Sequence, residues 1–440
     1  MSIKKIILEN IILKLADHLL GVKFMSKLIE LRKTFSLDED SLIKLQKNKL
    51  NKLLTFAIKS VPYYSNLEYL LSNSEIDIKK FPILEKSILS IQRDNLLSED
   101  ISKLIVCASS GSTGQQTFIY MSKNDLAYAR ATQILWWEWA GYKLGDPILQ
   151  TGINPNRGFI KSIKDKVLNT YYLQAFTHSK KDVLIALSWA MKQNKPVLAG
   201  YASSLYVIAK YALEEGIKVD FKVAITWGDK LFDHYKKTIT DAFGIDVYET
   251  YGSGEGLMLG GQKDLKQMYL MSPNVYVEIV NDKGIEVEDG EMGHVIVTNL
   301  NAFSMPLIRY RIGDLAIKLP ANSIPKTREL GLPVWQKIIG RDTDLVKTRL
   351  NKFLVVHSFT GIFEHIPEIK QFCVIQNDLN GIVIEYIEGE GFYKDILNKI
   401  KKDITSYLDE PFEIVFKEVK NILPTKSGKP QLIISKLPKE

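Results

Sequence analysis

The chain of 440 residues contains few of the residues that build disulfide frameworks and structural metal sites. It has two cysteines, Cys107 and Cys373, with no CxxC pair and no paired histidine at zinc-ligand spacing. We therefore expect neither a disulfide framework nor a structural zinc site, and this cysteine content favours a reducing, cytoplasmic compartment. The sequence also lacks an apolar run of the ~18 residues that a membrane-spanning helix requires.

The chain also lacks a strong excess of one charge. Lysine and arginine number 58 against 51 acidic residues, a net charge of +7 that neither requires nor excludes anionic partners. Because the basic residues form no single block with aromatic platforms, we expect no nucleic-acid partner. The hydrophobic content of 45% is typical of globular proteins, and at ~150 residues per domain the length predicts two or three units.

The first ~95 residues have a helical pattern. Apolar residues recur at alternating spacings of four and three, at Leu8, Ile12, Leu15, Leu19 and Val22. Lysines flank this stripe, at Lys4, Lys5, Lys14 and Lys23. The favoured interpretation is a helix that packs on its own domain, and the alternative is a helix that contacts a membrane surface or a partner.

From about residue 103 the pattern changes to short apolar runs that alternate with amphipathic stretches. We expect strands at 104–108 (buried), 117–120, 195–199, 222–227 and 245–250, and helices at 124–140, 202–215 and 230–243. Strands that alternate with helices of about 10–15 residues predict a largely parallel sheet covered by helices.

The last third of the chain has a different composition. Short alternating strands over 275–318 predict an antiparallel addition, and strands at 381–386 and 412–416 with a helix at 391–408 predict a small α+β unit. The predicted fold class is therefore α/β. A large multi-layer N-terminal domain (1–339) has mostly parallel sheets and an antiparallel addition, and a small mobile α+β domain (340–440) follows it.

The first motif that could carry chemistry is the loop Ser-Ser-Gly-Ser-Thr-Gly-Gln-Gln-Thr at 109–117. Its amides and hydroxyls can surround phosphate oxygens. The loop lies between two strands and has no lysine, so it is not of the Walker type. Taken alone, such a loop is more often a simple hairpin connection.

Two further motifs place carboxylates on glycine-containing turns. Tyr-Gly-Ser-Gly-Glu-Gly at 251–256 follows a predicted strand, where ligands bind in open α/β sheets, and makes Glu255 a candidate magnesium ligand. The alternative is a solvated turn glutamate. Arg-Tyr-Arg-Ile-Gly-Asp at 309–314 places Asp314 where it suits ribose hydroxyls, and the alternative is a structural Arg–Asp pair.

The last two motifs carry basic residues. Gly-Arg-Asp-Thr-Asp at 340–344 places Arg341 among acids at the expected domain boundary. Leu-Pro-Thr-Lys-Ser-Gly-Lys at 423–429 places Lys426 and Lys429 on a hairpin-like segment. Each is individually typical of a solvated surface.

The order and spacing of the five motifs together resemble the adenylate-forming superfamily of acyl-CoA synthetases, in its phenylacetate–CoA ligase/CapK-like branch. The resemblance covers most of the chain and includes residues 61–64, 81–86 and 371–376. It implies an ATP-dependent ligase that activates a small-molecule carboxylate with MgATP to an acyl-AMP and releases pyrophosphate. The acyl group then passes to a thiol, an amine or a hydroxyl.

The resemblance also implies roles for individual residues. The implied nucleotide-binding residues are Ser109, Ser110, Gly111, Ser112, Thr113, Gly114, Gly228, Asp229, Tyr251, Gly252, Ser253, Asp314 and Arg341. Glu255 would hold Mg2+, Lys429 would bridge the carboxylate and the α-phosphate, and Arg341 would assist. Trp136, Tyr201 and Trp227 would line the acyl pocket, although several large rings on one helix are also typical of a core.

The acceptor is the least determined part of the hypothesis. Because CapK-like proteins are associated with surface polysaccharide gene clusters, a sugar amine or hydroxyl is favoured. An aryl- or acyl-CoA ligase, an AMP-transferring adenylyltransferase and a non-catalytic binding subunit are the alternatives. Asn351 stands where CoA-using relatives have glycine, which argues against CoA. Gln115 and Gln116 replace a phosphate-loop lysine, and Asp342 or Asp344 would serve as the hinge.

Overall fold

The computed structural model describes residues 6–108, 118–152, 158–175, 179–335, 337–341, 345–350, 353–363, 366, 368–408, 410–423 and 431–437. The N-terminal part is helical, as predicted, with α2 (Leu13–Leu20), α3 (Phe24–Thr34), α4 (Glu39–Ser60) and α5 (Lys86–Ile91). Helix α4 begins where the Asp38 side chain accepts a hydrogen bond from the Ser41 amide, which satisfies one of the unpaired donors of the first turn. In the part of the chain that the structure describes, no helix is long and apolar enough to cross a membrane.

A seven-stranded sheet forms the centre of the N-terminal part, in the order β4-β3-β5-β6-β7-β8-β9. Its strands are β3 (Ile148–Gly152), β4 (Thr170–Gln174), β5 (Val197–Tyr201), β6 (Val223–Trp227), β7 (Val247–Gly252), β8 (Met258–Gly261) and β9 (Tyr269–Leu270). The first five strands in that order pair in parallel, and β8 and β9 are antiparallel additions. The predicted parallel sheet is confirmed, whereas β3 and β4 were not predicted.

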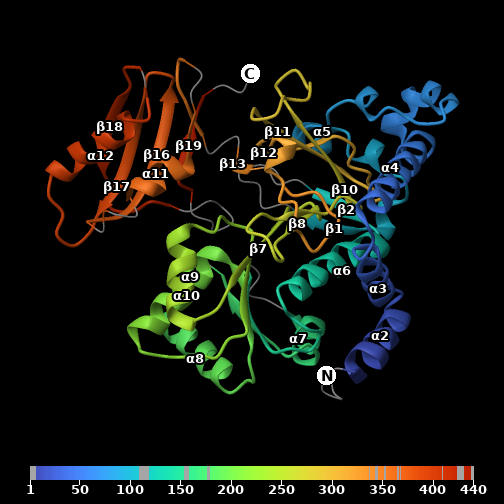
Figure 1. Cartoon of the computed structure of the whole chain (residues 1–440), viewed down its shortest axis with the longest axis horizontal. Coiled ribbons are helices and arrows are strands. Elements are labelled where there is room, and N and C mark those ends of the chain that lie inside the picture. The colour runs from blue at the N-terminus through green and yellow to red at the C-terminus, as the bar shows by residue number, and fades with distance from the viewer. Residues whose placement is uncertain are drawn as a thin grey trace.

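Helices cover both faces of this sheet (Figure 1). They are α6 (Lys123–Trp139), α7 (Gly158–Val167), α8 (Lys180–Met191), α9 (Ala202–Glu214) and α10 (Asp233–Phe243). Neighbouring residues of β5 pack on opposite faces of the sheet. Leu198 lies in the core formed with α8, α9 and α10, and Val197 lies in the core that contains α6. Burial on both faces is typical of parallel sheets and explains why these strands are continuous apolar runs.

A second sheet is antiparallel, as predicted for 275–318. Its order is β10 (Val275–Val280), β11 (Met292–Asn299), β12 (Tyr310–Ile317) and β13 (Lys337–Arg341). The pairing of β12 with β13 sets Asp314 directly opposite Arg341. Two residues predicted separately for the nucleotide site are therefore neighbours in one sheet.

The strand predicted at 104–108 forms, but the prediction that it is buried is wrong. β1 (Ile105–Ala108) pairs with β2 (Phe118–Met121) in a two-stranded ribbon. Ile105 and Val106 are 38% and 53% exposed because this ribbon does not join either large sheet. A short apolar run does not reveal whether a second layer covers it.

The described residues from 345 onward have a hydrophobic core of their own, and their ribbon stands apart from the two larger sheets in Figure 1. The elements are β14 (Leu345–Lys347), β15 (Phe353–Val355), α11 (Val356–Phe363), β16 (Ile369–Asp378), β17 (Gly381–Glu388), α12 (Asp395–Thr405), β18 (Glu413–Glu418) and β19 (Ile433–Ser435). The main sheet has the order β18-β17-β16-β19. This α+β unit agrees with the predicted fold class, and the boundary at 340 stays a prediction.

Candidate active site

The glycine-rich motif at 251–256 forms a tight turn between β7 and β8. The Ser253 amide donates to the Leu257 carbonyl at 2.9 Å, and the Gly256 amide donates to the Ser253 carbonyl at 3.1 Å. Gly256 has φ of 78°, a left-handed conformation that favours glycine. The turn therefore stands at the carboxyl end of a parallel strand, the edge at which open α/β sheets bind ligands.

Two side-chain hydrogen bonds join this turn to β12. The Tyr251 hydroxyl donates to Asp314 Oδ2 at 2.5 Å, and the Tyr310 hydroxyl donates to Glu255 Oε1 at 3.2 Å. Tyr310 and Asp314 both belong to β12, so one strand contacts the turn at both carboxylate motifs. The two carboxylate motifs therefore form one site. Tyr310 was not predicted as a site residue, and its contact with Glu255, 55 positions away in the chain, is visible only in the structure.

Glu255 lies in the interior and not in a solvated turn. The residue is only 5% exposed, so the alternative interpretation of an exposed turn glutamate is wrong. Close to it in the chain, Ser253 Oγ is buried and has no hydrogen-bond partner among the described residues. A buried carboxylate beside an unpartnered hydroxyl is a polar pair that a ligand could complete.

This donor set fits Mg2+ only if a ligand supplies further oxygens. Within the described ranges, no three His, Cys, Asp or Glu side chains group so as to hold a metal ion. Mg2+ usually binds through one or two carboxylates together with phosphate oxygens and water. Glu255 is therefore suited to a metal that arrives with a phosphate-bearing substrate.

The two arginines of the 309–314 motif have partners outside the motif. Arg311 Nε lies 3.0 Å from Glu85 Oε1, and Arg309 forms a two-bond pair with Glu278, at 3.1 Å and 3.0 Å. Asp314 is 7% exposed and accepts from Tyr251. These contacts place the motif's two arginines in the scaffold and its aspartate against the 251–256 turn, and the nucleotide-binding role of Asp314 stays a prediction.

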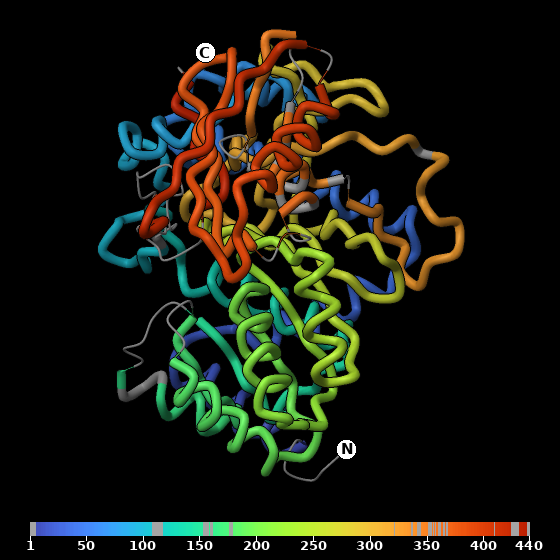
Figure 2. The backbone as a smooth tube through the Cα atoms, turned by 90° about the vertical axis from the view of Figure 1, so that its left-hand side faces the viewer, coloured from blue at the N-terminus to red at the C-terminus, as the bar shows by residue number. Residues whose placement is uncertain are grey.

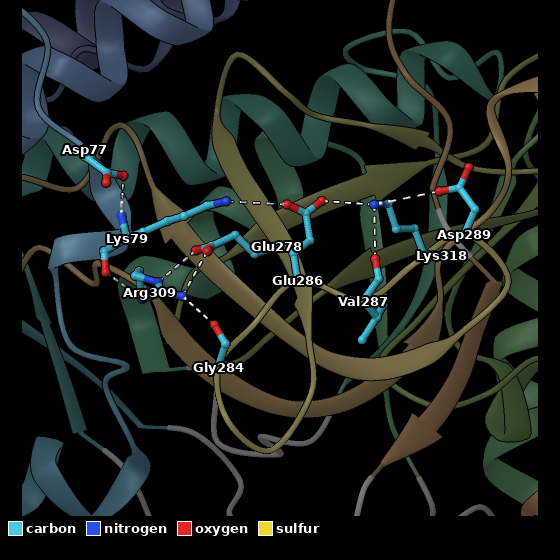
Figure 3. A network of polar contacts seen from close by, with 9 residues as sticks. All are labelled: Asp77, Lys79, Glu278, Gly284, Glu286, Val287, Asp289, Arg309 and Lys318. Atoms are coloured by element: carbon cyan, nitrogen blue, oxygen red, sulfur yellow. Dashed lines mark hydrogen bonds and ion pairs between the residues drawn. The ribbon is translucent and has the colours of Figure 1, made fainter.

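Arg309 and Glu278 form the buried part of a polar network that continues to the more exposed Glu286 (Figure 3). The Arg309 guanidinium also donates to the carbonyls of Phe81 (3.0 Å) and Gly284 (3.3 Å), so it joins the N-terminal segment to the antiparallel sheet. Burial raises the pKa of Glu278, and the positive charge of Arg309 opposes this rise. Arg309 also has φ of 50°, a backbone conformation that a non-glycine residue keeps only when its surroundings hold it.

The predicted Gly228–Asp229 pair lies where β6 ends. The Asp229 carboxylate accepts from the amides of Ala202 (2.6 Å) and Ser203 (3.1 Å) and from the Ser203 hydroxyl (2.5 Å). It therefore binds the first amides of α9, the end of a helix that favours negative charge. The nucleotide-binding role of Gly228 and Asp229 stays a prediction.

The predicted acyl-pocket residues lie beside this edge of the sheet. Trp227 stacks on Trp137 with ring centroids 5.5 Å apart, and the Tyr201 ring lies so close to Gly228 that an added Cβ would be 2.4 Å from it. Burial raises the pKa of Tyr201 to about 12. Trp136 is 3% exposed and packs against Gly261 of β8, a typical core position. Substrate contacts for Trp136, Tyr201 and Trp227 stay predictions.

Several predicted residues lie outside the residues that the structure describes. They are Ser109, Ser110, Gly111, Ser112, Thr113, Gly114, Asp342, Asp344, Asn351, Lys426 and Lys429. Arg341 is described as the last residue of β13, without its side chain. Strand β2 contacts the turn at 251–256, because an added Cβ on Gly256 would lie 3.0 Å from the Met121 side chain.

Comparisons with known proteins agree with this architecture. The family model of the CapK C-terminal domain matches residues 347–436. Protein CapK of Staphylococcus aureus is 24% identical over 419 residues, which cover 90% of this chain and 90% of CapK. A phenylacetate-coenzyme A ligase of Pseudomonas putida is 23% identical over 376 residues, which cover 76% of this chain and 79% of the ligase.

A solved structure shows the same fold. The structure of 2-hydroxyisobutyryl-CoA ligase in the postadenylation state has a TM-score of 0.70 at 16% identity, covering 92% of this chain and 91% of the ligase. The fold of this chain is therefore that of the ligase structure, and its relatives in sequence include CapK and phenylacetate-coenzyme A ligases. These similarities support the predicted resemblance to the adenylate-forming superfamily, in the branch of CapK and the phenylacetate–CoA ligases.

Proposed function

We propose that this protein is an ATP-dependent, AMP-forming ligase that converts a small-molecule carboxylate and ATP to an acyl-AMP and pyrophosphate, and then transfers the acyl group. The observation that carries the proposal is the joining of two separate motifs. Tyr251 donates to Asp314, and Tyr310 donates to Glu255. The carboxylate proposed to bind the ribose hydroxyls and the carboxylate proposed to bind Mg2+ are therefore joined to the same edge of the sheet. The phenylacetate-coenzyme A ligase relatives support the ligase activity.

The proposed chemistry needs positive charge, because one anion attacks another. The substrate carboxylate attacks the α-phosphate of ATP and pyrophosphate leaves, so negative charge builds up at the phosphorus centre. Lys429 and Arg341 would stabilise this charge, and Mg2+ held by Glu255 would neutralise phosphate oxygens. Asp314 would accept hydrogen bonds from the ribose hydroxyls, with its carboxylate oriented by Tyr251. A mobile C-terminal domain would bring Lys429 in for this step and withdraw it afterwards.

The direct test is ATP–pyrophosphate exchange with a panel of aliphatic, aryl and hydroxy acids. We expect one class of acid to support exchange that depends on both the acid and magnesium. Binding of MgATP, measured separately by calorimetry, distinguishes a wrong choice of acids from a wrong function. A chain that binds no MgATP at millimolar concentration would contradict the proposal and favour a non-catalytic binding subunit.

Glu255→Gln should raise the magnesium concentration needed for half-maximal exchange by about 10-fold. The substitution keeps the size of the side chain and its bond from Tyr310, but removes the negative charge that attracts the metal. The matched control is Tyr310→Phe, which removes the neighbouring hydroxyl and keeps the carboxylate. Equal magnesium dependence in Glu255→Gln and the unmodified protein would show that Glu255 only shapes the turn.

Asp314→Asn should raise the KM for ATP by about 10- to 100-fold, because hydrogen bonds to a charged group contribute about 1.5–3 kcal/mol. The substitution should also reduce the preference for ATP over 2′-deoxy-ATP, since the ribose hydroxyls lose a charged acceptor. Tyr251→Phe leaves the carboxylate in place and should have a smaller effect. An unchanged ratio between the two nucleotides would assign Asp314 to the scaffold.

For the second half-reaction we propose an amine or hydroxyl acceptor of the kind found in surface polysaccharides. The association of CapK-like proteins with surface polysaccharide gene clusters, which the sequence resemblance implies, favours this choice. The phenylacetate-coenzyme A ligase relatives support CoA as the second candidate. Asn351 would add a side chain where a thiol must approach within ~3.5 Å of the acyl carbonyl.

We expect CoA to give little turnover beyond the acyl-AMP step, and Asn351→Gly to leave exchange unchanged. The measurement is acyl-CoA formation with the preferred acid, coupled to AMP release. Rapid formation of the thioester, with one AMP released for each acyl-CoA, would contradict the proposed amine or hydroxyl acceptor and identify the protein as a CoA ligase. A stable product that carries AMP would identify an adenylyltransferase instead.

A further inference from the structure

The first described helix presents a row of apolar side chains to solvent. It runs from residue 6 through η1 (Leu8–Ile12) and α2 to Leu20. Its exposed large apolar residues are Ile6, Ile7, Ile11, Ile12, Leu15, Leu19 and Leu20, with Leu19 at 74%. Single exposed apolar residues are ordinary, but a continuous row along one helix marks an interaction surface.

This helix is attached to the domain and does not form a free tail. Lys123 Nζ donates to the Leu20 carbonyl at 3.1 Å, and Leu8 is buried. Arg32 bonds Glu9 on this helix and Glu138 on α6, both at 2.5 Å. The outward direction of the apolar row is therefore set by contacts with the rest of the protein.

Both carboxylates of this helix are engaged with the protein. Glu9 binds Arg32, and Asp17 Oδ2 accepts from the Met25 amide at 2.6 Å. Lys14 and His18 are exposed on the helix, and Lys23 is exposed directly after it. The outer face therefore combines apolar side chains with two lysines and an imidazole, and both of its carboxylates are bonded to the protein.

Helix α7 repeats this pattern at the same end of the molecule, as the two views show (Figure 1 and Figure 2). Ile163 and Val167 are 47% and 42% exposed, and Lys166 is exposed between them. The acid of this helix, Asp165, is 8% exposed and so points away from solvent. Two separate helices thus combine apolar and basic residues on the outside with buried or bonded acids.

We propose that the outer faces of residues 6–20 and α7 together bind the surface of a membrane that contains anionic phospholipid. A basic amphipathic helix lies in the plane of the lipid interface, with apolar side chains among the acyl chains and lysines near the headgroups. A second copy of this chain fits less well, because two faces that carry cations and no free carboxylate repel each other. The inference does not depend on the proposed ligase activity.

The test is co-sedimentation of the full chain with vesicles of pure phosphatidylcholine and of 70% phosphatidylcholine with 30% phosphatidylglycerol. We expect at least ~10-fold tighter binding to the mixed vesicles, reduced several-fold in 0.5 M salt because salt screens the lysines. Leu15→Glu with Leu19→Glu should weaken this binding at least ~10-fold. The matched control is Ile91→Glu with Ile285→Glu, at similarly exposed positions elsewhere, which should bind as the unmodified chain does.

Circular dichroism and thermal unfolding of both double variants, without lipid, test that they fold. Equal binding by the two double variants, or no preference for phosphatidylglycerol, would overturn the proposal. A different result would assign this face to a second copy of the chain. In that case the unmodified chain binds neither vesicle and is a dimer in sedimentation velocity, and the Leu15→Glu, Leu19→Glu variant is a monomer.

Discussion

Lys429→Ala should slow ATP–pyrophosphate exchange by at least ~100-fold, equivalent to about 2.7 kcal/mol of transition-state stabilisation. The proposed role of this ammonium group is to stabilise charge that develops at the α-phosphate only as the carboxylate attacks. Binding of ATP, measured by calorimetry, should therefore change little. The comparison of kcat with the ATP dissociation constant separates this effect from loss of substrate binding.

Lys426 offers an internal control, because it lies three residues earlier in the same Pro- and Gly-containing segment. Lys426→Ala should retain most of the exchange activity. If both variants lose activity equally, the segment contributes by its overall charge. If Lys429→Ala exchanges as fast as the unmodified protein, the assignment of Lys429 is wrong.

Arg309→Ala should lower the free energy of unfolding by about 3–5 kcal/mol, the usual effect of removing one partner of a buried ion pair. The variant leaves the Glu278 carboxylate, 6% exposed, without its guanidinium. It also removes the donors to the Phe81 and Gly284 carbonyls. Urea unfolding followed by circular dichroism measures the loss.

Arg311→Ala is the matched control, since Arg311 lies two residues later on the same motif and pairs with Glu85, whose side chain is 45% exposed. A pair with one solvated partner contributes about 0–1 kcal/mol, so this variant should be nearly as stable as the unmodified chain. Equal losses in the two variants would contradict the structural role assigned to Arg309.

The stability of Arg309→Ala should also depend on pH. Burial raises the pKa of Glu278 and Arg309 lowers it, so without Arg309 the folded state keeps Glu278 protonated to higher pH than the unfolded chain does. The folded state then binds more protons, and its stability falls as pH rises. The deficit relative to the unmodified chain should therefore be larger at pH 8 than at pH 5.

Much of the fold could be predicted because local patterns decide element type. The parallel strands and helices between residues 195 and 250 were recognised because short apolar runs alternate with amphipathic stretches. The elements between 148 and 191 were not predicted, since Ile148–Gly152 and Thr170–Gln174 are short and mix polar with apolar residues. Such runs are ambiguous until the neighbouring strands are known.

The sequence by itself determined the chemistry available to this protein: hydroxyls and glycines before a strand, carboxylates on two turns, and lysines near the C-terminus. Only the tertiary structure decided which of these groups meet. Tyr251 and Asp314 are 63 residues apart and come together because β12 passes the end of β7. The structure also decided that Glu255 is buried and Ile105 is exposed. Burial depends on which layers of the fold pack over a residue, and a local sequence pattern does not contain that information.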